Sequence, residues 1–212
     1  LRTTEGTNFI YDHNLNFSFN NIELADKFSM TTQLGFNARR DTYDQFGITS
    51  TDQIVAGFFN HNNFLTTTNQ DPVAGQLNRR SERNIMGAYG EFAFDYDGFM
   101  FLTVSGRNDW ASTLEQENRS LFYPGVSLAF VPTSIDGIGS AEGLGFLKLR
   151  AGFGTSARFP IPYQTRAVLS TDPANVINPV GNVTTNSLPA TQPNLYLQPE
   201  LQIKFKLGLQ AE

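Results

Sequence analysis

The residues best suited to contact a polar ligand lie together near the middle of the chain. Arg107 and Asp109 are two positions apart, and Trp110 follows directly. An aromatic face can stack on a sugar ring, while a guanidinium donates hydrogen bonds and a carboxylate accepts them. These three residues predict a substrate-binding cluster. An ion pair that only orients a loop is the alternative interpretation.

The chain offers little for covalent chemistry. It has no Cys and two His, His13 and His61. His13 shares the apolar face of its segment, which favours packing or an interfacial role, and His61 lies among asparagines in a polar stretch. Two isolated histidines do not predict a metal site, and the glycine-rich run Gly137–Gly145 does not open a helix after a strand, as a phosphate cradle would. We expect no catalytic residue, no metal and no cofactor, and therefore no enzyme.

Composition narrows the class of protein. The 212 residues carry a formal net charge of −5, and 13% of them are aromatic, which disordered chains are not. An acidic balance, with no basic cluster along the sequence, argues against nucleic acid as a partner. No stretch approaches the roughly 20 apolar residues of a spanning helix, which excludes a helical membrane protein. A membrane β-barrel stays possible, because its signal per strand is weak.

Apolar and polar side chains alternate along about seven segments. Alternate residues of a strand point to opposite faces, so this pattern predicts an all-β antiparallel sheet with one oily and one wet face. The segments are 9–20, 28–39, 83–96, 99–109, 120–131, 146–155 and 200–210.

Short connections are predicted between some of these segments. A turn is expected at Asn20 and Asn21, and Asp97–Gly98 predicts a type I′ hairpin, because both residues tolerate positive φ. Pro124 lies on an oily face, where it removes a ladder hydrogen bond and predicts a bulge or weak pairing.

Two long polar stretches, Arg40–Glu82 and Ser156–Gln198, are expected to be loops. Such loops are uncommon in a compact soluble domain and normal outside a large membrane barrel. In a soluble domain the oily face would be the core, and in a membrane barrel it would meet lipid. Aromatic residues at strand ends, such as Tyr96 and Phe99, favour the membrane barrel. A soluble all-β carbohydrate-binding module that uses the region of Trp110 remains the alternative.

Four blocks of the sequence resemble the SusC/RagA family of TonB-dependent outer-membrane transporters. They are RNIMGAYGEFAFDYDGFMFLTVSGRNDWASTL (Arg83–Leu114), NRSLFYPGVSLAFVPTS (Asn118–Ser134), LKLRAGFGTSA (Leu147–Ala157) and QPNLYLQPEL (Gln192–Leu201). The last block is similar to the family's Asn-Pro-Asn-Leu-Lys-Pro-Glu pattern, and the blocks follow the family's order.

The resemblance implies a 22-stranded barrel that encloses an N-terminal plug. It also implies a SusD-like surface lipoprotein as a lid, TonB as the energy source, and oligosaccharides or peptides as substrates. On this view residues 1–212 are a partial barrel in the cell outer membrane, in contact with lipid, without the plug or the segment that meets TonB. We expect a piece of a longer polypeptide, with Arg107 and Asp109 on the lumen side at the outer end of a strand.

Overall fold

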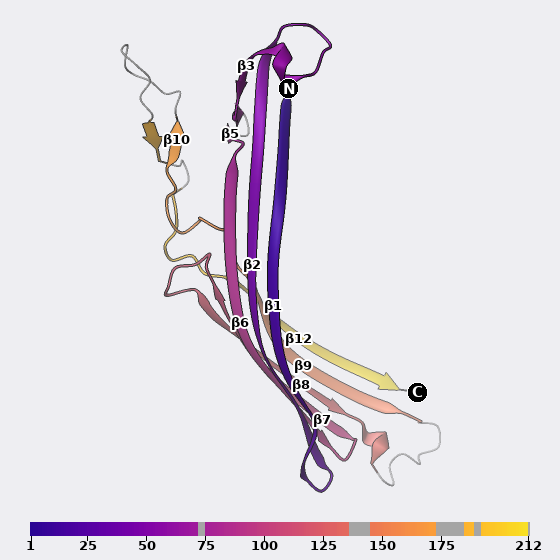
Figure 1. Ribbon diagram of the computed structural model, residues 1–212. Coiled ribbons are helices and arrows are strands. Elements are labelled where there is room, and N and C mark those ends of the chain that lie inside the picture. Colours follow the sequence, from indigo (N-terminus) through magenta and orange to yellow (C-terminus); the bar gives the residue numbers. More distant parts are fainter. Residues whose placement is uncertain (72–74, 136–144, 173–184, 189–191, 212) are drawn as a thin grey trace. The chain divides into compact units, whose positions relative to one another are not determined.

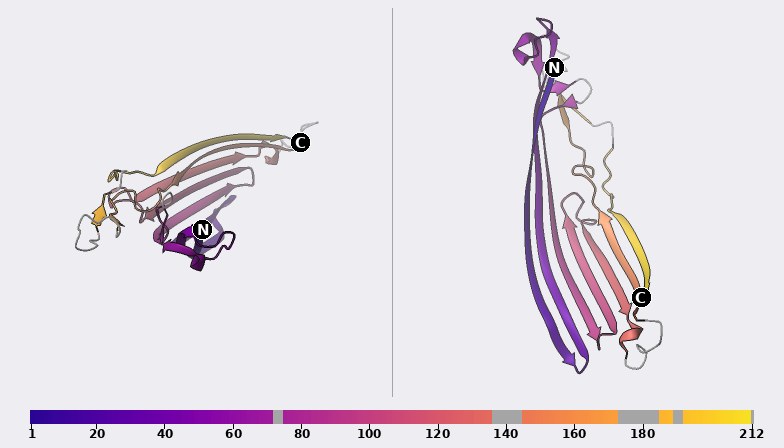
Figure 2. Two further views of the ribbon diagram at one scale, coloured as in Figure 1. Left: turned by 90° about the horizontal axis from the view of Figure 1, so that it is seen from above. Right: turned by 90° about the vertical axis from the view of Figure 1, so that its right-hand side faces the viewer.

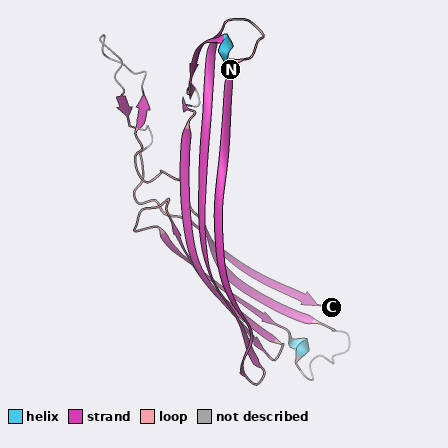
Figure 3. Cartoon of the chain, in the orientation of Figure 1, coloured by secondary structure: helices cyan, strands magenta, loops and turns pink. Residues whose placement is uncertain are grey.

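The computed structural model describes residues 1–71, 75–135, 145–172, 185–188 and 192–211 (Figures 1 and 3). Its main element is an antiparallel eight-stranded sheet with the order β1-β2-β6-β7-β8-β9-β12, in which β3 pairs additionally with β2. The seven strands of this path are β1 (Arg2–Ala25), β2 (Phe28–Gln53), β6 (Arg79–Tyr96), β7 (Met100–Ala111), β8 (Ser120–Phe130), β9 (Leu147–Arg158) and β12 (Glu200–Ala211). The predicted all-β fold with about seven strands is confirmed.

The remaining elements are short. They are β3 (Phe64–Thr68), β4 (Gln70–Asp71), β5 (Gly75–Gln76), β10 (Ser170–Asp172), β11 (Thr185–Ser187) and the 3-10 turns η1 (His61–Asn63) and η2 (Pro132–Ser134). Contacts divide the chain into two units, residues 1–12 with 39–84 and residues 13–38 with 85–212.

Strand register places apolar residues in continuous rows across neighbouring strands. One row joins Phe92, Val104, Val126, Phe153 and Phe205. The strands that form it, β6 to β9 and β12, lie side by side in the right-hand view of Figure 2. The rows on either side of it carry small and polar side chains, as the period of two predicts.

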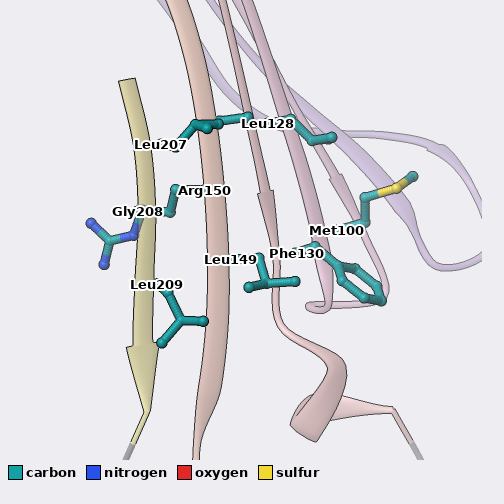
Figure 4. A pocket seen from close by; sticks show the side chains of 9 residues that line it. Met100, Leu128, Phe130, Leu149, Arg150, Leu207, Gly208 and Leu209 are labelled. Atoms are coloured by element: carbon teal, nitrogen blue, oxygen red, sulfur yellow. The ribbon is translucent and has the colours of Figure 1, made fainter. Parts of the chain in front are cut away.

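The apolar face is exposed. Phe17 is 53% exposed and Phe122 58%, and among the described residues only Leu77, Ala111, Leu114 and Val131 are buried hydrophobic ones. A shallow hollow of about 650 Å³ on this face is lined by Met100, Phe130, Leu149 and Leu209, which lie in one row on four strands (Figure 4). A soluble sandwich would cover such a face with a second layer, and in the described part of the chain none covers it.

Aromatic residues gather at the end of the sheet where the turns are short. Five rings from neighbouring strands and turns contact one another with centroids 5.3–6.3 Å apart, those of Phe28, Phe94, Tyr96, Phe99 and Phe130. Ten residues along β6 separate Tyr96 from Met86, which lies opposite Trp110. Ten residues span about 33 Å of strand, and a tilt of about 40° reduces this to about 25 Å, the height of the apolar band of a membrane barrel.

The Asp97–Gly98 hairpin is confirmed. Both residues have positive φ, of 49° and 70°, and the Phe99 amide donates a hydrogen bond to the Tyr96 carbonyl at 3.2 Å. These are the features of a type I′ turn, which suits the twist of the flanking strands.

The turn predicted at Asn20–Asn21 is wrong. β1 continues to Ala25, and the chain reverses at Asp26 and Lys27, where Lys27 has φ 65°. Asn21 does adopt a positive φ of 51°, but within the strand. Asparagine tolerates that conformation inside a strand as well as in a turn, so the residue type alone could not place the reversal.

The loop predicted for Arg40–Glu82 is also wrong over much of its length. β2 runs on to Gln53, β6 begins at Arg79, and η1, β3, β4 and β5 lie between them. These strand extensions carry polar residues at buried positions as well as at exposed ones, for example at Thr42, Thr49 and Ser50. The apolar–polar alternation that marks a half-buried strand is therefore absent from them.

The second long stretch agrees better with its prediction than the first. Ser156–Gln198 contains only the end of β9 and the β10–β11 hairpin among its described residues. Pro124 forms no bulge, since β8 pairs with β7 in unbroken register. The pairing of β8 with β9 starts only at Gly125, which agrees with the weak pairing predicted as the alternative. Most of the run Gly137–Gly145 lies outside the described residues.

Candidate functional site

Arg107 and Asp109 form an ion pair on the polar face of β7. Arg107 Nε donates a hydrogen bond to Asp109 Oδ1 at 2.7 Å, and Asp109 is only 8% exposed. The two side chains meet because residues i and i+2 of a strand share a face. Charge-assisted pairs of this kind hold their members in a fixed orientation.

Neighbouring strands complete the surroundings of the pair. Gly87 lies opposite Asp109 on β6, and a Cβ atom there would collide with the Asp109 carboxylate and the Arg107 guanidinium. On β8, the phenol of Tyr123 interacts with the Asp109 carboxylate. The Arg107 guanidinium carbon lies 5.5 Å from the centre of the Tyr89 ring, within the range of a cation–π contact.

Tyr89 extends this cluster toward the first strand. Its hydroxyl donates a hydrogen bond to Asn16 Oδ1 on β1. The ring crosses β2 at Gly35, where any Cβ atom would collide with it. Asn16, Tyr89, Arg107, Asp109 and Tyr123 therefore form one connected polar network across the wall, which we call the wall network.

Trp110 does not join Arg107 and Asp109. It lies opposite Met86 and Ser120 in the strand register, on the apolar face, and is 40% exposed. The alternation of the strand already separates position 110 from positions 107 and 109. Closeness in sequence therefore predicted a triad that the strand geometry divides between two faces.

Tyr89, Tyr123 and Asn16 belong to the site although no sequence motif marks them. Each comes from a different strand, and only the cross-strand register brings them to Arg107. The period-two pattern does place Tyr89 on the wet face, which is the one signal that could have marked it. Tyr123 lies on the polar face of β8, opposite Arg107.

A second charged cluster lies in the other unit. Arg39 and Arg83 both donate to the carboxylate of Asp41, at 2.8 and 2.5 Å, and Arg39 lies 3.9 Å from Asp12. Two arginines and two aspartates balance in charge here, and the cluster ties neighbouring strands together.

The two histidines lie far from Arg107 in sequence, and each belongs to a different setting. His13 is exposed on β1. His61 Nδ1 is 2.8 Å from Ser50 Oγ, and its Nε2 is 2.8 Å from Thr3 Oγ1. Ser50 is 1% exposed and also bonds to Thr67, so a substrate has no access to this Ser–His pair. Both ring nitrogens lie against hydroxyl groups, so among the described residues no acid orients the ring, as one would in a catalytic triad.

The loop between β7 and β8 is joined to the segment that follows β9. Arg166 donates two hydrogen bonds to the carboxylate of Glu115, at 2.8 and 2.7 Å. The hydrogen bonds from Arg166 and Thr165 lower the pKa of Glu115 from 4.5 to about 2. The β7–β8 loop is thereby held to the segment after β9.

Within the described residues, no helix is long and apolar enough to cross a membrane. Over the same residues, no group of three or more His, Asp and Glu side chains is arranged to hold a metal ion.

The fold and the site together define a class of protein. The sheet has one exposed apolar face, a polar face with charged networks, and aromatic rings at the strand ends. These are the features of the wall of a membrane β-barrel. The chain belongs to the family of TonB-dependent receptor-like β-barrels, whose model matches residues 2–210.

Known proteins similar to the chain agree with this family. The TonB-dependent receptor P26 of Formosa agariphila is 31% identical over 128 residues, which cover 59% of this chain and 12% of that protein. The RagAB peptide transporter has a TM-score of 0.71 at 20% identity, and the RagAB peptide importer in its open-open state 0.72 at 19%. Both matches cover 99% of this chain and 22% of the other, so the chain spans a small part of each relative's length.

Proposed function

We propose that the chain is a wall segment of a TonB-dependent transporter in the outer membrane, which imports oligosaccharides or peptides together with a SusD-like surface lipoprotein. The exposed apolar face carries this proposal. Side chains such as Phe17 and Phe122 would be costly to leave in water, and lipid removes that cost. The family of the chain and its likeness in fold to the RagAB structures support the same reading.

The polar face becomes the wall of the lumen in this proposal. The wall network would contact the substrate at the outer end of the strands, where Arg107 and Asp109 offer a donor and an acceptor. The short turns, such as Asp97–Gly98, would face the periplasm, and the long connections would face outward toward the lipoprotein. A plug and a TonB-contacting segment would belong to other parts of the whole protein.

No covalent reaction belongs to this function. The wall forms a passage, binds the substrate weakly and releases it when the plug moves. The runner-up, a soluble carbohydrate-binding module, needs Trp110 on one surface with Arg107 and Asp109. The register that places Trp110 on the opposite face argues against it.

Site-directed spin labelling tests the orientation of the wall. The chain contains no Cys, so single Val104→Cys and Ser105→Cys variants of the whole transporter, with any Cys elsewhere replaced, can be labelled in lipid vesicles. We expect oxygen to relax the label at position 104 and a water-soluble nickel chelate to relax the label at position 105. Equal access of the nickel chelate to both labels would contradict a lipid-facing apolar surface.

A further inference from the structure

Four cations line the polar face of the last two paired strands, one in each of four successive polar rows. Lys148 and Arg150 are on β9, and Lys204 and Lys206 are on β12, opposite Gly154 and Gly152. We call these four residues the basic cluster. They share the lumen-facing side because all four have the same parity in the β9–β12 register.

The basic cluster lacks carboxylate partners among the described residues. Every ion pair within 4.0 Å among the described residues involves a cation outside the basic cluster. Arg150 donates to the Gln210 amide oxygen at 3.0 Å, and Lys148 lies 5.9 Å from the centre of the Phe101 ring. Neither contact neutralises the charge, so the cluster differs from the self-paired Arg107 and Asp109.

A hollow accompanies these charges. It has a volume of about 540 Å³, and its lining includes Arg150, Lys206, Ser127, Gly152 and Gly208. A Cβ atom at Gly152 or Gly208 would have its nearest neighbour at 3.9 Å, so the floor is low and open. A ligand can approach the backbone closely where glycine replaces a side chain.

On the same polar face, the part of the sheet at β6 carries negative charge. Glu91 and Asp95 lie on the polar face of β6, in the rows that lead across β7 and β8 to Lys204 and Arg150. The positions between them are uncharged, for example Ser105 and Gly125. An anionic ligand would therefore be drawn to the β9–β12 side of the wall and repelled from β6.

The spacing of the cations indicates the form of the ligand. Lys204 and Lys206 are two positions apart on one strand, which separates their Cα atoms by about 7 Å. An extended peptide repeats its side chains on one side at the same spacing of about 7 Å, so each lysine can meet a carboxylate of its own. We propose that the basic cluster binds an extended acidic oligopeptide with carboxylates on alternate residues during import. This inference rests on the proposed transport function.

Peptide binding to the whole purified transporter tests the proposal. The probes are a fluorescent hexapeptide of alternating Glu and Thr and the same peptide with Gln in place of Glu. We expect the double variant Lys204→Gln and Lys206→Gln to weaken binding of the Glu peptide about tenfold and to leave the Gln peptide unchanged, because two solvent-accessible ion pairs are lost. Added salt should weaken binding of the Glu peptide to the wild type and do so less in the double variant.

Two further variants make the test specific. Gly152→Val keeps every charge and fills the floor of the hollow, so it should weaken binding of the Glu peptide as well. Arg158→Gln is the matched control, since Arg158 lies on the same face of β9 but opposite Glu200, and it should have no effect.

Several results would overturn the proposal. Unchanged affinity in the double variant, or an equal loss for both peptides, would do so, the latter indicating a contact to another part of the transporter. Preference of the wild type for a uronate oligosaccharide over the Glu peptide, with the same lysine dependence, would replace the peptide as the ligand. The orientation of the spin labels is independent of all these results, so a failure here is distinguishable from a failure of the transport function.

Discussion

At the scale of single residues, the Arg107–Asp109 pair is stabilised by the absence of a side chain at one neighbouring position and by contacts with two tyrosines. Gly87 leaves room for both side chains, and Tyr89 and Tyr123 approach them from the two adjacent strands. A carboxylate that is 8% exposed needs such partners, because an unpaired buried charge is costly. The pair is therefore rigid enough to orient a ligand.

We predict that Arg107→Ala in the whole transporter lowers the apparent affinity for its substrate roughly ten- to hundredfold, since a charge-assisted hydrogen bond contributes about 1.5–3 kcal/mol. Substrate uptake into cells with equal amounts of assembled barrel measures the effect. Trp110→Phe is the control, because Trp110 points to the opposite face and its replacement should leave the affinity unchanged. Import that is unaffected by Arg107→Ala would remove this residue from the substrate path.

At the scale of elements, the connections beyond β7 and β9 are held together by one exposed ion pair. Arg166 forms two hydrogen bonds with Glu115, and the pKa of the Glu115 carboxyl falls to about 2. The pKa of Glu115 is lowered when the two connections are joined, so the ionised form of Glu115 favours the joined state. This contribution is present above the ordinary pKa of 4.5 and is lost as the pH falls through about 2.

We predict that pepsin cleaves residues 159–169 roughly a few-fold more slowly at pH 3.5 than near pH 2, a small factor because solvent screens an exposed ion pair. Glu115→Gln should make cleavage fast already at pH 3.5 and remove most of its pH dependence, because the amide cannot form the charged pair. The rate of appearance of the two fragments, corrected for the activity of pepsin on an unfolded control at each pH, measures the opening. Identical corrected rates for wild type and variant across this range would show that the ion pair does not hold the two connections.

At the scale of the whole molecule, the distribution of side chains follows the surroundings of each face. The row from Phe92 through Val104 to Phe205 lies near the middle of the apolar band, between the rings of Tyr96 and Trp110. The next row along β7, at Ser105, belongs to the polar face.

We predict that Val104→Arg destabilises the folded barrel by about 2–4 kcal/mol, the cost of a charge at the midplane of the bilayer. Ser105→Arg should cost less than about 1 kcal/mol, because its side chain enters the watery lumen. Reversible urea unfolding of the whole protein in lipid vesicles measures both free energies. Similar losses at the two positions would contradict the assignment of the faces.

The amino-acid sequence by itself determined which residues share a face. Alternation is a property of the local backbone, so Phe92, Phe94 and Tyr96 could be grouped without knowledge of any partner strand. The same holds for the turn at Asp97–Gly98, where the two residues themselves favour positive φ. The resemblance in Arg83–Leu114 and the later blocks pointed to the family that the comparisons bear out.

The tertiary structure alone decided which strands lie side by side and in what register. Asn16 and Tyr89 are 73 positions apart, and their hydrogen bond depends on Gly35 in a third strand. The extension of β2 to Gln53 and the true turn at Asp26–Lys27 were likewise beyond local pattern. Pairing energy arises between strands that are distant in sequence, and a strand whose buried positions are also polar shows no alternation that would mark it in the sequence.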